Sequence, residues 1–154
     1  MDTTGKIKEK FGSKIEDWRE HSKNRIYFVL DKVYVCEAAN FLFKDLGLRL
    51  ATATASDLPD GFEMIYHYSD DKTGVIYSVR AFIKGKDKPE IDSISTVFKA
   101  AEWIEREIWE LFGINFKNHP DLRHLLLMDE WPQGEYPMRK NYKKPHEKKE
   151  QDKC

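Results

Sequence analysis

The sequence has few cysteines and lacks the motifs of most cofactor sites. Its two cysteines are Cys36 and Cys154. An iron–sulfur cluster usually takes four protein ligands, and a zinc ribbon needs CxxC pairs that are missing here. We therefore expect this chain to hold no metal and no redox cofactor. Cys36 is expected to be a buried side chain, Cys154 to have no structural role, and no disulfide to form.

Long hydrophobic runs and an excess of one charge are also lacking. No segment approaches the roughly 20 apolar residues that span a bilayer, and the N-terminus lacks the apolar stretch of a signal peptide. The formal net charge is -1, although 34% of the residues are charged. No overall basic field exists to attract nucleic acid or anionic lipid. These absences predict a cytoplasmic protein that reaches a membrane only through a partner.

Candidate catalytic groups are scattered rather than clustered. There is no GxGxxG, P-loop or HExxH motif. Glu105 and Glu107 would lie about 200° apart around a helix, so they cannot share one proton site. The five histidines show no metal-ligand spacing, and we expect no metal site among His21, His67, His119, His124 and His146.

Hydrophobic periodicity predicts an α+β domain. Apolar residues recur at helical spacing over 6–20 and over 33–46, the latter ending at Gly47. Short β-rich runs predict strands over 25–30 and 48–55. A hairpin follows, with strands 62–69 and 75–83 alternating apolar and polar residues around the turn 70–74. The last three strands should form an antiparallel meander whose apolar face packs against the helices.

The clearest helix follows the polar loop 84–89. Ser93 or Ser95 is expected to cap it, and Glu102 precedes Arg106 by four residues, the favourable order for an ion pair. Gly113 should end it. Its apolar stripe comprises Val97, Ala101, Ile104, Ile108 and Leu111.

Residues 114–142 have a composition that disordered segments lack. Pro120, Pro132 and Pro137 exclude a long helix, yet aromatic and large apolar residues are frequent. The segment should therefore lie against its own domain or a partner. We predict an α+β domain over 1–113 (a small antiparallel sheet with helices on one face), an extended partner-binding arm over 114–142, and a disordered charged tail over 143–154.

Two motifs in this region are long and unusual. The first reads EREIWELFGINF from Glu105 and continues as KNHPDLR up to Arg123. The second comprises DEW at 129–131 and YPMRKNY at 136–142. They resemble the signature of the 30-kDa subunit family of complex I, the NADH:quinone oxidoreductases, and of their hydrogenase relatives. The sequence departs from that signature at Glu110, His124, Met138 and Asn141, and in the link 132–135 between Trp131 and Tyr136.

The resemblance implies a non-catalytic scaffold subunit in the peripheral arm of a respiratory complex, on the cytoplasmic side of the membrane. Its partners would be the large subunit with the quinone site and a neighbouring iron–sulfur subunit. Iron–sulfur clusters, flavin and quinone would belong to other subunits. The close alternative is the equivalent subunit of a membrane-bound group 4 NiFe hydrogenase or formate hydrogenlyase, whose large subunit holds the NiFe site.

The two motifs also supply a predicted interface. Each arginine can donate two parallel hydrogen bonds to a carboxylate. Arginines and carboxylates near one helix end can therefore form a charged network that fixes the position of this chain on a partner. Alternatively, Arg106 and Glu107 lock the arm to its own helix. We expect Gly113 and the His119–Pro120 break to direct the arm away from the domain. The predicted interface comprises Glu105, Arg106, Glu107, Phe112, Gly113, His119, Pro120, Asp121, Leu122, Arg123, Trp131, Pro137, Arg139 and Lys140.

Two other functions stay open. An independent small enzyme would use a carboxylate or a histidine, and turnover by the purified monomer would identify it. A nucleic-acid binder would use the lysine-rich tail, but Glu and Asp alternate with the lysines there.

Overall fold

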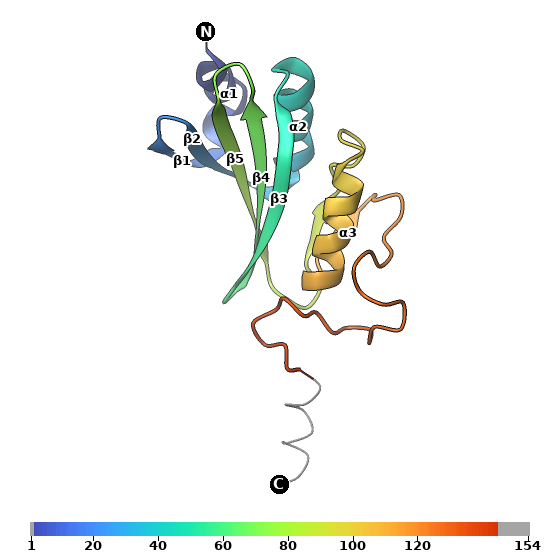
Figure 1. Cartoon of the computed structure of the whole chain (residues 1–154). Coiled ribbons are helices and arrows are strands. Elements are labelled where there is room, and N and C mark those ends of the chain that lie inside the picture. The colour runs from blue at the N-terminus through green and yellow to red at the C-terminus, as the bar shows by residue number, and fades with distance from the viewer. Residues whose placement is uncertain (1, 145–154) are drawn as a thin grey trace.

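A computed structural model describes residues 2–144 (Figure 1). Short 3-10 and π-helical stretches, Lys32–Tyr34 and Phe41–Asp45, flank the second helix. In chain order the main elements are α1 (Thr3–Phe11), β1 (Ile15–Ser22), β2 (Arg25–Leu30), α2 (Val35–Asn40), β3 (Arg49–Leu58), β4 (Gly61–Asp70), β5 (Val75–Lys84), β6 (Glu90–Asp92), α3 (Ala101–Phe112) and β7 (Asn115–Lys117).

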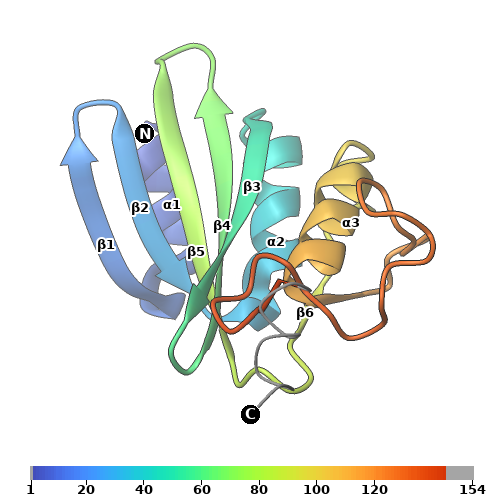
Figure 2. The ribbon, with the colours of Figure 1, turned by 60° about the horizontal axis from the view of Figure 1, so that its bottom comes forward.

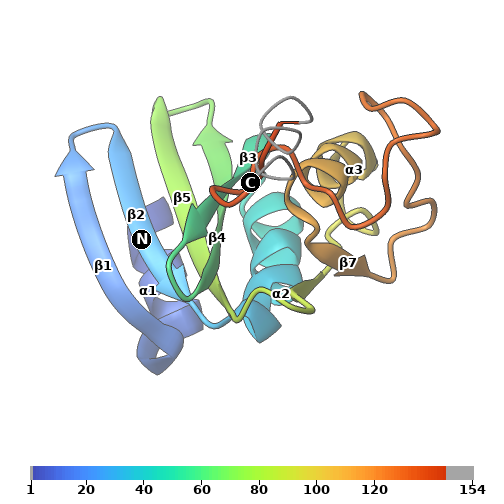
Figure 3. The same ribbon diagram turned by 90° about the horizontal axis from the view of Figure 1, so that it is seen from below.

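The five long strands form one sheet in the order β1-β2-β5-β4-β3. β2 and β5 run parallel, and the other neighbours are antiparallel. The meander predicted for the last three strands is therefore confirmed. The helices pack on one face of the sheet, with α1 and α2 behind it and α3 next to β3 (Figures 2 and 3). This is the predicted α+β fold.

The N-terminal segment differs from the helix predicted over 6–20. Helix α1 ends at Phe11, Gly12 takes a φ of 35°, and β1 then pairs with β2. The helical spacing across Gly12 was coincidental, because Trp18 instead stacks on Phe28 with 5.3 Å between ring centroids. Most β1 residues are charged or polar. Charged residues on an edge strand prevent it from pairing with other chains. They also remove the alternation of apolar and polar residues by which a strand is predicted.

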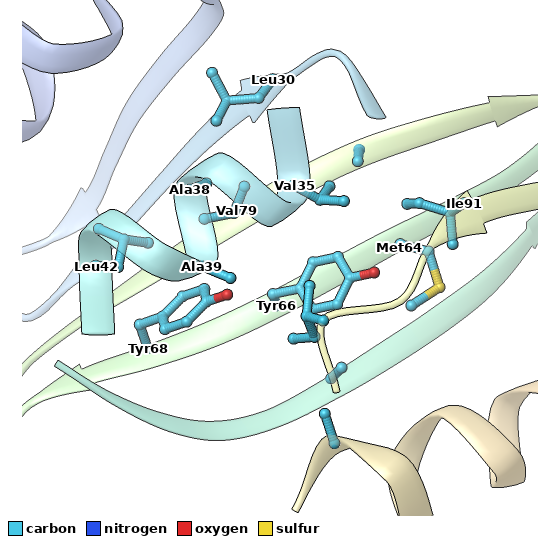
Figure 4. Close-up of a cluster of buried hydrophobic side chains, with 14 of the residues drawn as sticks. Leu30, Val35, Ala38, Ala39, Leu42, Met64, Tyr66, Tyr68, Val79 and Ile91 are labelled. Carbon is cyan, nitrogen blue, oxygen red and sulfur yellow. The ribbon is translucent and has the colours of Figure 1, made fainter. Parts of the chain in front are cut away.

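The hairpin provides most of the core. Tyr66 lies opposite Val79 and Tyr68 opposite Tyr77, so these residues share the face that the helices cover. Figure 4 shows the two tyrosines of β4 gathered with aliphatic side chains of α2. Alternation of apolar and polar residues therefore correctly identified the buried face.

Helix α3 begins differently from the prediction. Its first residue is Ala101, and no side chain caps the N-terminus. Ser93 and Ser95 are buried and bond to each other at 2.6 Å rather than capping the helix. The predicted Glu102–Arg106 pair is also wrong, because the Arg106 guanidinium turns to backbone carbonyls of the arm.

The first residues after α3 extend the fold before the chain becomes irregular. Strand β7 pairs in parallel with β6. Residues 118–144 then curve around α3 as irregular chain, drawn in orange to red in Figures 1 and 2. Within residues 2–144, no helix has the length and apolar character needed to cross a bilayer.

Candidate partner interface

Glu105 lies at the centre of a buried polar cluster beneath α3. One carboxylate oxygen accepts a hydrogen bond from the Ile94 amide at 2.7 Å, and the other accepts one from the Ser93 hydroxyl at 2.5 Å. Burial raises the pKa of Glu105 to about 7, although both hydrogen bonds oppose the shift. The side chain is only 1% exposed. Its role is to hold the segment that leads into α3.

His119 connects the start of the arm to α3. Its Nε2 donates to the Glu102 carbonyl at 3.0 Å, and its Nδ1 accepts from the Asp121 amide at 3.0 Å. This pair of bonds requires the neutral ring with its proton on Nε2. Nε2 also lies 3.9 Å from a Glu105 carboxylate oxygen. The His119 side chain is therefore a buried link between the arm and α3.

Arg106 and Glu110, one turn apart on α3, hold the next part of the arm. Arg106 donates from Nε to the Arg123 carbonyl at 3.0 Å and from Nη2 to the His124 carbonyl at 2.6 Å. The Glu110 carboxylate accepts from the amides of residues 125–127 at 3.0, 2.8 and 3.3 Å and from His124 Nδ1 at 3.2 Å. Burial raises the pKa of Glu110, but these hydrogen bonds outweigh burial and lower it overall.

Arg139 attaches the second motif to the end of α3. Its Nε donates to the Phe112 carbonyl at 2.6 Å, its Nη1 donates to the Lys86 carbonyl at 3.1 Å, and its guanidinium lies 4.4 Å from the Tyr136 ring centroid. Gly113 makes this packing possible. A Cβ at that position would lie 2.7 Å from the Arg139 guanidinium and would overlap the Tyr136 ring.

Asp57 supplies a further attachment from the end of β3. One of its oxygens accepts from the Lys140 amide at 2.8 Å, and the other pairs with the Lys86 ammonium. Burial raises the pKa of Asp57, while the lysine contacts lower it and prevail. Asp57 and Lys86 were not predicted as site residues, because no local motif in the sequence marks either one. The buried serines and the acceptor role of Glu110 were missed for the same reason.

These contacts correct the expectation that the arm points away from the domain. Gly113 ends α3 as predicted, with a φ of 73° and its amide bonded to the Trp109 carbonyl at 2.8 Å. After β7, however, the chain returns along α3. Arg106 and Glu110 supply polar partners for arm backbone that would otherwise need water. The alternative in which Arg106 locks the domain's own arm describes the observed contacts, whereas Glu107 remains exposed.

The predicted interface residues thus divide into two groups. Those packed or half-buried within the chain are Glu105, Arg106, Phe112, Gly113, His119, Leu122, Trp131, Pro137 and Arg139. Those exposed to solvent are Glu107, Pro120, Asp121, Arg123 and Lys140. Asp121 and Arg123 form an exposed ion pair at 2.8 Å.

Large hydrophobic side chains accompany this exposed group on the arm. Leu126, Met128 and Met138 are 64%, 68% and 55% exposed. We define the outer arm surface as the exposed arm residues Pro120, Asp121, Arg123, Leu126, Met128 and Met138. This surface combines apolar side chains with an ion pair on backbone that α3 holds in place.

Among the described histidines and cysteines, His67 and Cys36 bond to residues outside the arm. His67 was expected to face solvent but is half-buried, with its Nδ1 2.8 Å from the Ser78 hydroxyl. Cys36 is half-buried, and burial raises the pKa of its thiol. His146 and Cys154 lie outside the described residues. Within the described part of the chain, no three His, Cys, Asp or Glu side chains come together in a way that could hold a metal.

Comparison with known proteins places both motifs in one family. The family model for "Respiratory-chain NADH dehydrogenase, 30 Kd subunit" matches residues 28–148. The C subunit of the F(420)H(2) dehydrogenase of Methanosarcina mazei is 37% identical over 136 residues, covering 86% of this chain and 85% of that protein. The C/D subunit of the NADH-quinone oxidoreductase of Phocaeicola vulgatus is 40% identical over 83 residues, which are 54% of this chain and 16% of that longer protein.

The fold has a counterpart among solved structures. A chain in the structure of the membrane-bound sulfane sulfur reductase, an archaeal respiratory membrane complex, aligns with a TM-score of 0.83 and 21% identity, covering 98% of this chain and 89% of that one. That likeness bears on the fold alone. The family match spans most of the sequence and contains both motifs. This chain therefore belongs to the family of the 30-kDa subunit of respiratory-chain NADH dehydrogenase, as a subunit of an oxidoreductase complex.

Proposed function

We propose that this chain is a scaffold subunit of the peripheral arm of a complex I-type oxidoreductase. It carries no redox centre and docks through the outer arm surface on the large subunit that holds the quinone site. One observation carries the proposal: Leu126, Met128 and Met138 are exposed although the arm around them is held to the domain. Large apolar side chains on a fixed backbone are typical of the centre of an interface.

The attachment of the arm favours tight docking. When a disordered segment binds, part of the favourable free energy of binding is spent on ordering the segment. A segment that is already ordered does not have this cost. Contacts from Arg106, Glu110 and Arg139 order the arm during folding. The exposed Asp121–Arg123 pair then lies at the rim, where charges set register and association rate more than affinity.

The relatives support a large neighbour as the partner. The C/D protein of Phocaeicola vulgatus joins a region similar to this chain to a much longer remainder. Such a fusion would preserve a direct contact between a chain of the 30-kDa type and a large subunit. A neighbouring iron–sulfur subunit and a place on the cytoplasmic side of the membrane complete the proposal. Under the close alternative, the large partner is the NiFe subunit of a membrane-bound hydrogenase.

Co-purification tests the proposal directly. The tagged chain should retain the large subunit from membranes solubilised in mild detergent, and a Leu126→Glu/Met128→Glu variant should lose it. Val33→Glu is the matched control, because Val33 is 61% exposed but lies outside the arm. Undiminished retention by the double variant would remove the outer arm surface from the interface. Nickel-ligating cysteines in the retained large subunit would indicate the hydrogenase alternative.

A further inference from the structure

A buried acid and a buried histidine lie side by side where the arm leaves the domain. The side chains of Glu105 and His119 are 1% and 0% exposed, and His119 Nε2 lies 3.9 Å from a Glu105 carboxylate oxygen. The same Nε2 donates to the Glu102 carbonyl at 3.0 Å. We propose that these two side chains form a proton-dependent switch, in which loss of the Glu105 proton draws His119 away from the Glu102 carbonyl and loosens the start of the arm.

The observed bonds suit a neutral histidine beside a protonated acid. The His119 ring accepts the Asp121 amide at Nδ1, 3.0 Å away, and a second ring proton would sit on that nitrogen and oppose the Asp121 N–H. The carboxyl group can hold a proton without breaking this attachment. The Ser93 hydroxyl, which donates to the ionised carboxylate, can accept from the protonated one, because its own proton can then turn to Ser95, 2.6 Å away.

Glu105 is the acid of this cluster that changes charge near neutral pH. Burial raises its pKa to about 7, and the charge of Glu102 on the same helix adds to the rise. Asp92 and Lys117, the charged groups of β6 and β7 that interact with the Cys36 thiol, form an ion pair at 3.2 Å. The titratable groups of β4 and α2 that interact with Glu105 stay neutral near pH 7, because burial raises the pKa of each: Tyr66, Tyr68 and Cys36.

Loss of the proton leaves a carboxylate that needs more donors. A buried charge is costly unless it is paired or well hydrogen-bonded. The Ser93 hydroxyl and the Ile94 amide already donate, and the N–H of His119 Nε2 is a further donor 3.9 Å away. A hydrogen bond of about 2.7–3.2 Å requires the ring to move by about 1 Å. That movement takes Nε2 from the Glu102 carbonyl and disturbs the Asp121 amide that Nδ1 holds.

Nuclear magnetic resonance of the full chain tests the switch between about pH 5.5 and pH 8.5. The Glu105 carboxyl carbon reports the proton, and the Asp121 amide reports the attachment of the arm. We expect both signals to titrate with one midpoint near 7. Above it, the Asp121 amide should exchange roughly fivefold faster after correction for intrinsic exchange, as expected for loss of one neutral hydrogen bond. An Asp121 signal that does not follow the carboxyl titration overturns the inference and leaves the proposed function intact.

Variants identify the group that titrates. Glu105→Gln keeps an acceptor for the Ile94 amide but cannot ionise, so the Asp121 amide should show no step near pH 7. A step with the wild-type midpoint in this variant would assign the titration to another group and overturn the inference.

Ser93→Ala provides an independent check. The Ser93 hydrogen bond lowers the pKa of Glu105, so its removal should raise the midpoints of the carboxyl carbon and of the Asp121 amide together. A rise in only one of them contradicts the coupling. Glu107→Gln, on the exposed side of the same helix, is the control and should leave both midpoints unchanged.

Discussion

Replacing Glu110 with alanine removes the acceptor that consecutive arm amides share. In the wild-type chain the carboxylate accepts from the amides of residues 125–127 and from His124. The alanine variant keeps the helix, since alanine is the best helix former. The core of the sheet is also untouched. The change therefore isolates the attachment of the arm from the stability of the domain.

The free energy lost in Glu110→Ala depends on the charge of the carboxylate acceptor and on how deeply the arm amides are buried. A hydrogen bond to a charged group contributes about 1.5–3 kcal/mol. The three amides are only half-buried or exposed, so water satisfies them when the arm opens, and their contributions do not add fully. We expect a loss of about 3 kcal/mol in the free energy that holds the arm closed, or roughly a 100-fold larger opening constant.

Hydrogen exchange measured by mass spectrometry reports this opening directly. A peptide spanning residues 122–128 should exchange roughly 100-fold faster in Glu110→Ala, while peptides from β4 and β5 exchange as in wild type, because the opening is local. Glu107→Ala, on the exposed side of the same helix, should leave the arm peptide unchanged. Unchanged exchange at residues 125–127 in Glu110→Ala would refute the idea that this carboxylate holds the arm.

Other substitutions separate the remaining contacts. Arg106→Ala removes two bonds to arm carbonyls, so the large subunit and its activity should be lost from the purified complex; a complete, active complex would contradict this. Glu105 has a folded-state pKa of about 7, above its ordinary value of 4.5, so its contribution to stability is full below 4.5 and falls as pH rises through 7. The melting temperature of the wild type should therefore fall more between pH 5 and pH 8 than that of Glu105→Gln, which cannot ionise at this position. An equal fall in both proteins would refute the raised pKa of Glu105. Gly113→Ala adds a clash with Tyr136 to the strain of a positive φ and should cost about 3 kcal/mol in urea unfolding, whereas Gly74→Ala, with a φ of 71° and open space, should cost about 1 kcal/mol. Equal costs for the two glycine variants would show that the arm does not press on α3.

The sequence predicted those elements whose patterns arise from local geometry. Alternating residues from Phe62 to Ile83 identified the hairpin and its buried face, and the apolar stripe with Gly113 identified α3. Strand β1 was missed because its exposed edge allows charged residues, which carry no alternation. Ser93 is a residue type that often caps helices, but its hydroxyl donates to the buried Glu105 carboxylate instead. Nothing near Ser93 in the sequence indicates that it lies beside a buried acid.

The motifs located the candidate site but not the direction in which its residues face. Helical spacing places Arg106 and Glu110 on neighbouring positions of α3, yet it does not say which segment covers them. The answer lies in contacts across the chain, such as the Lys140 amide with Asp57, 83 residues apart, and Arg139 with the Lys86 carbonyl, 53 residues apart. Side-chain partners at such separations leave no trace in a single sequence.

The division of the motifs into an internal and an external group has a consequence for assembly. If Arg106 and Glu110 only order the arm, their loss reduces the fraction of chain that is ready to bind and leaves the contacts with the partner intact. Excess partner should then restore assembly of Glu110→Ala by mass action, because binding itself pulls the arm into place. The Leu126→Glu/Met128→Glu variant loses the contacts themselves, so the same excess should not restore it. Titration of both variants with the large subunit therefore distinguishes residues that prepare the interface from residues that form it.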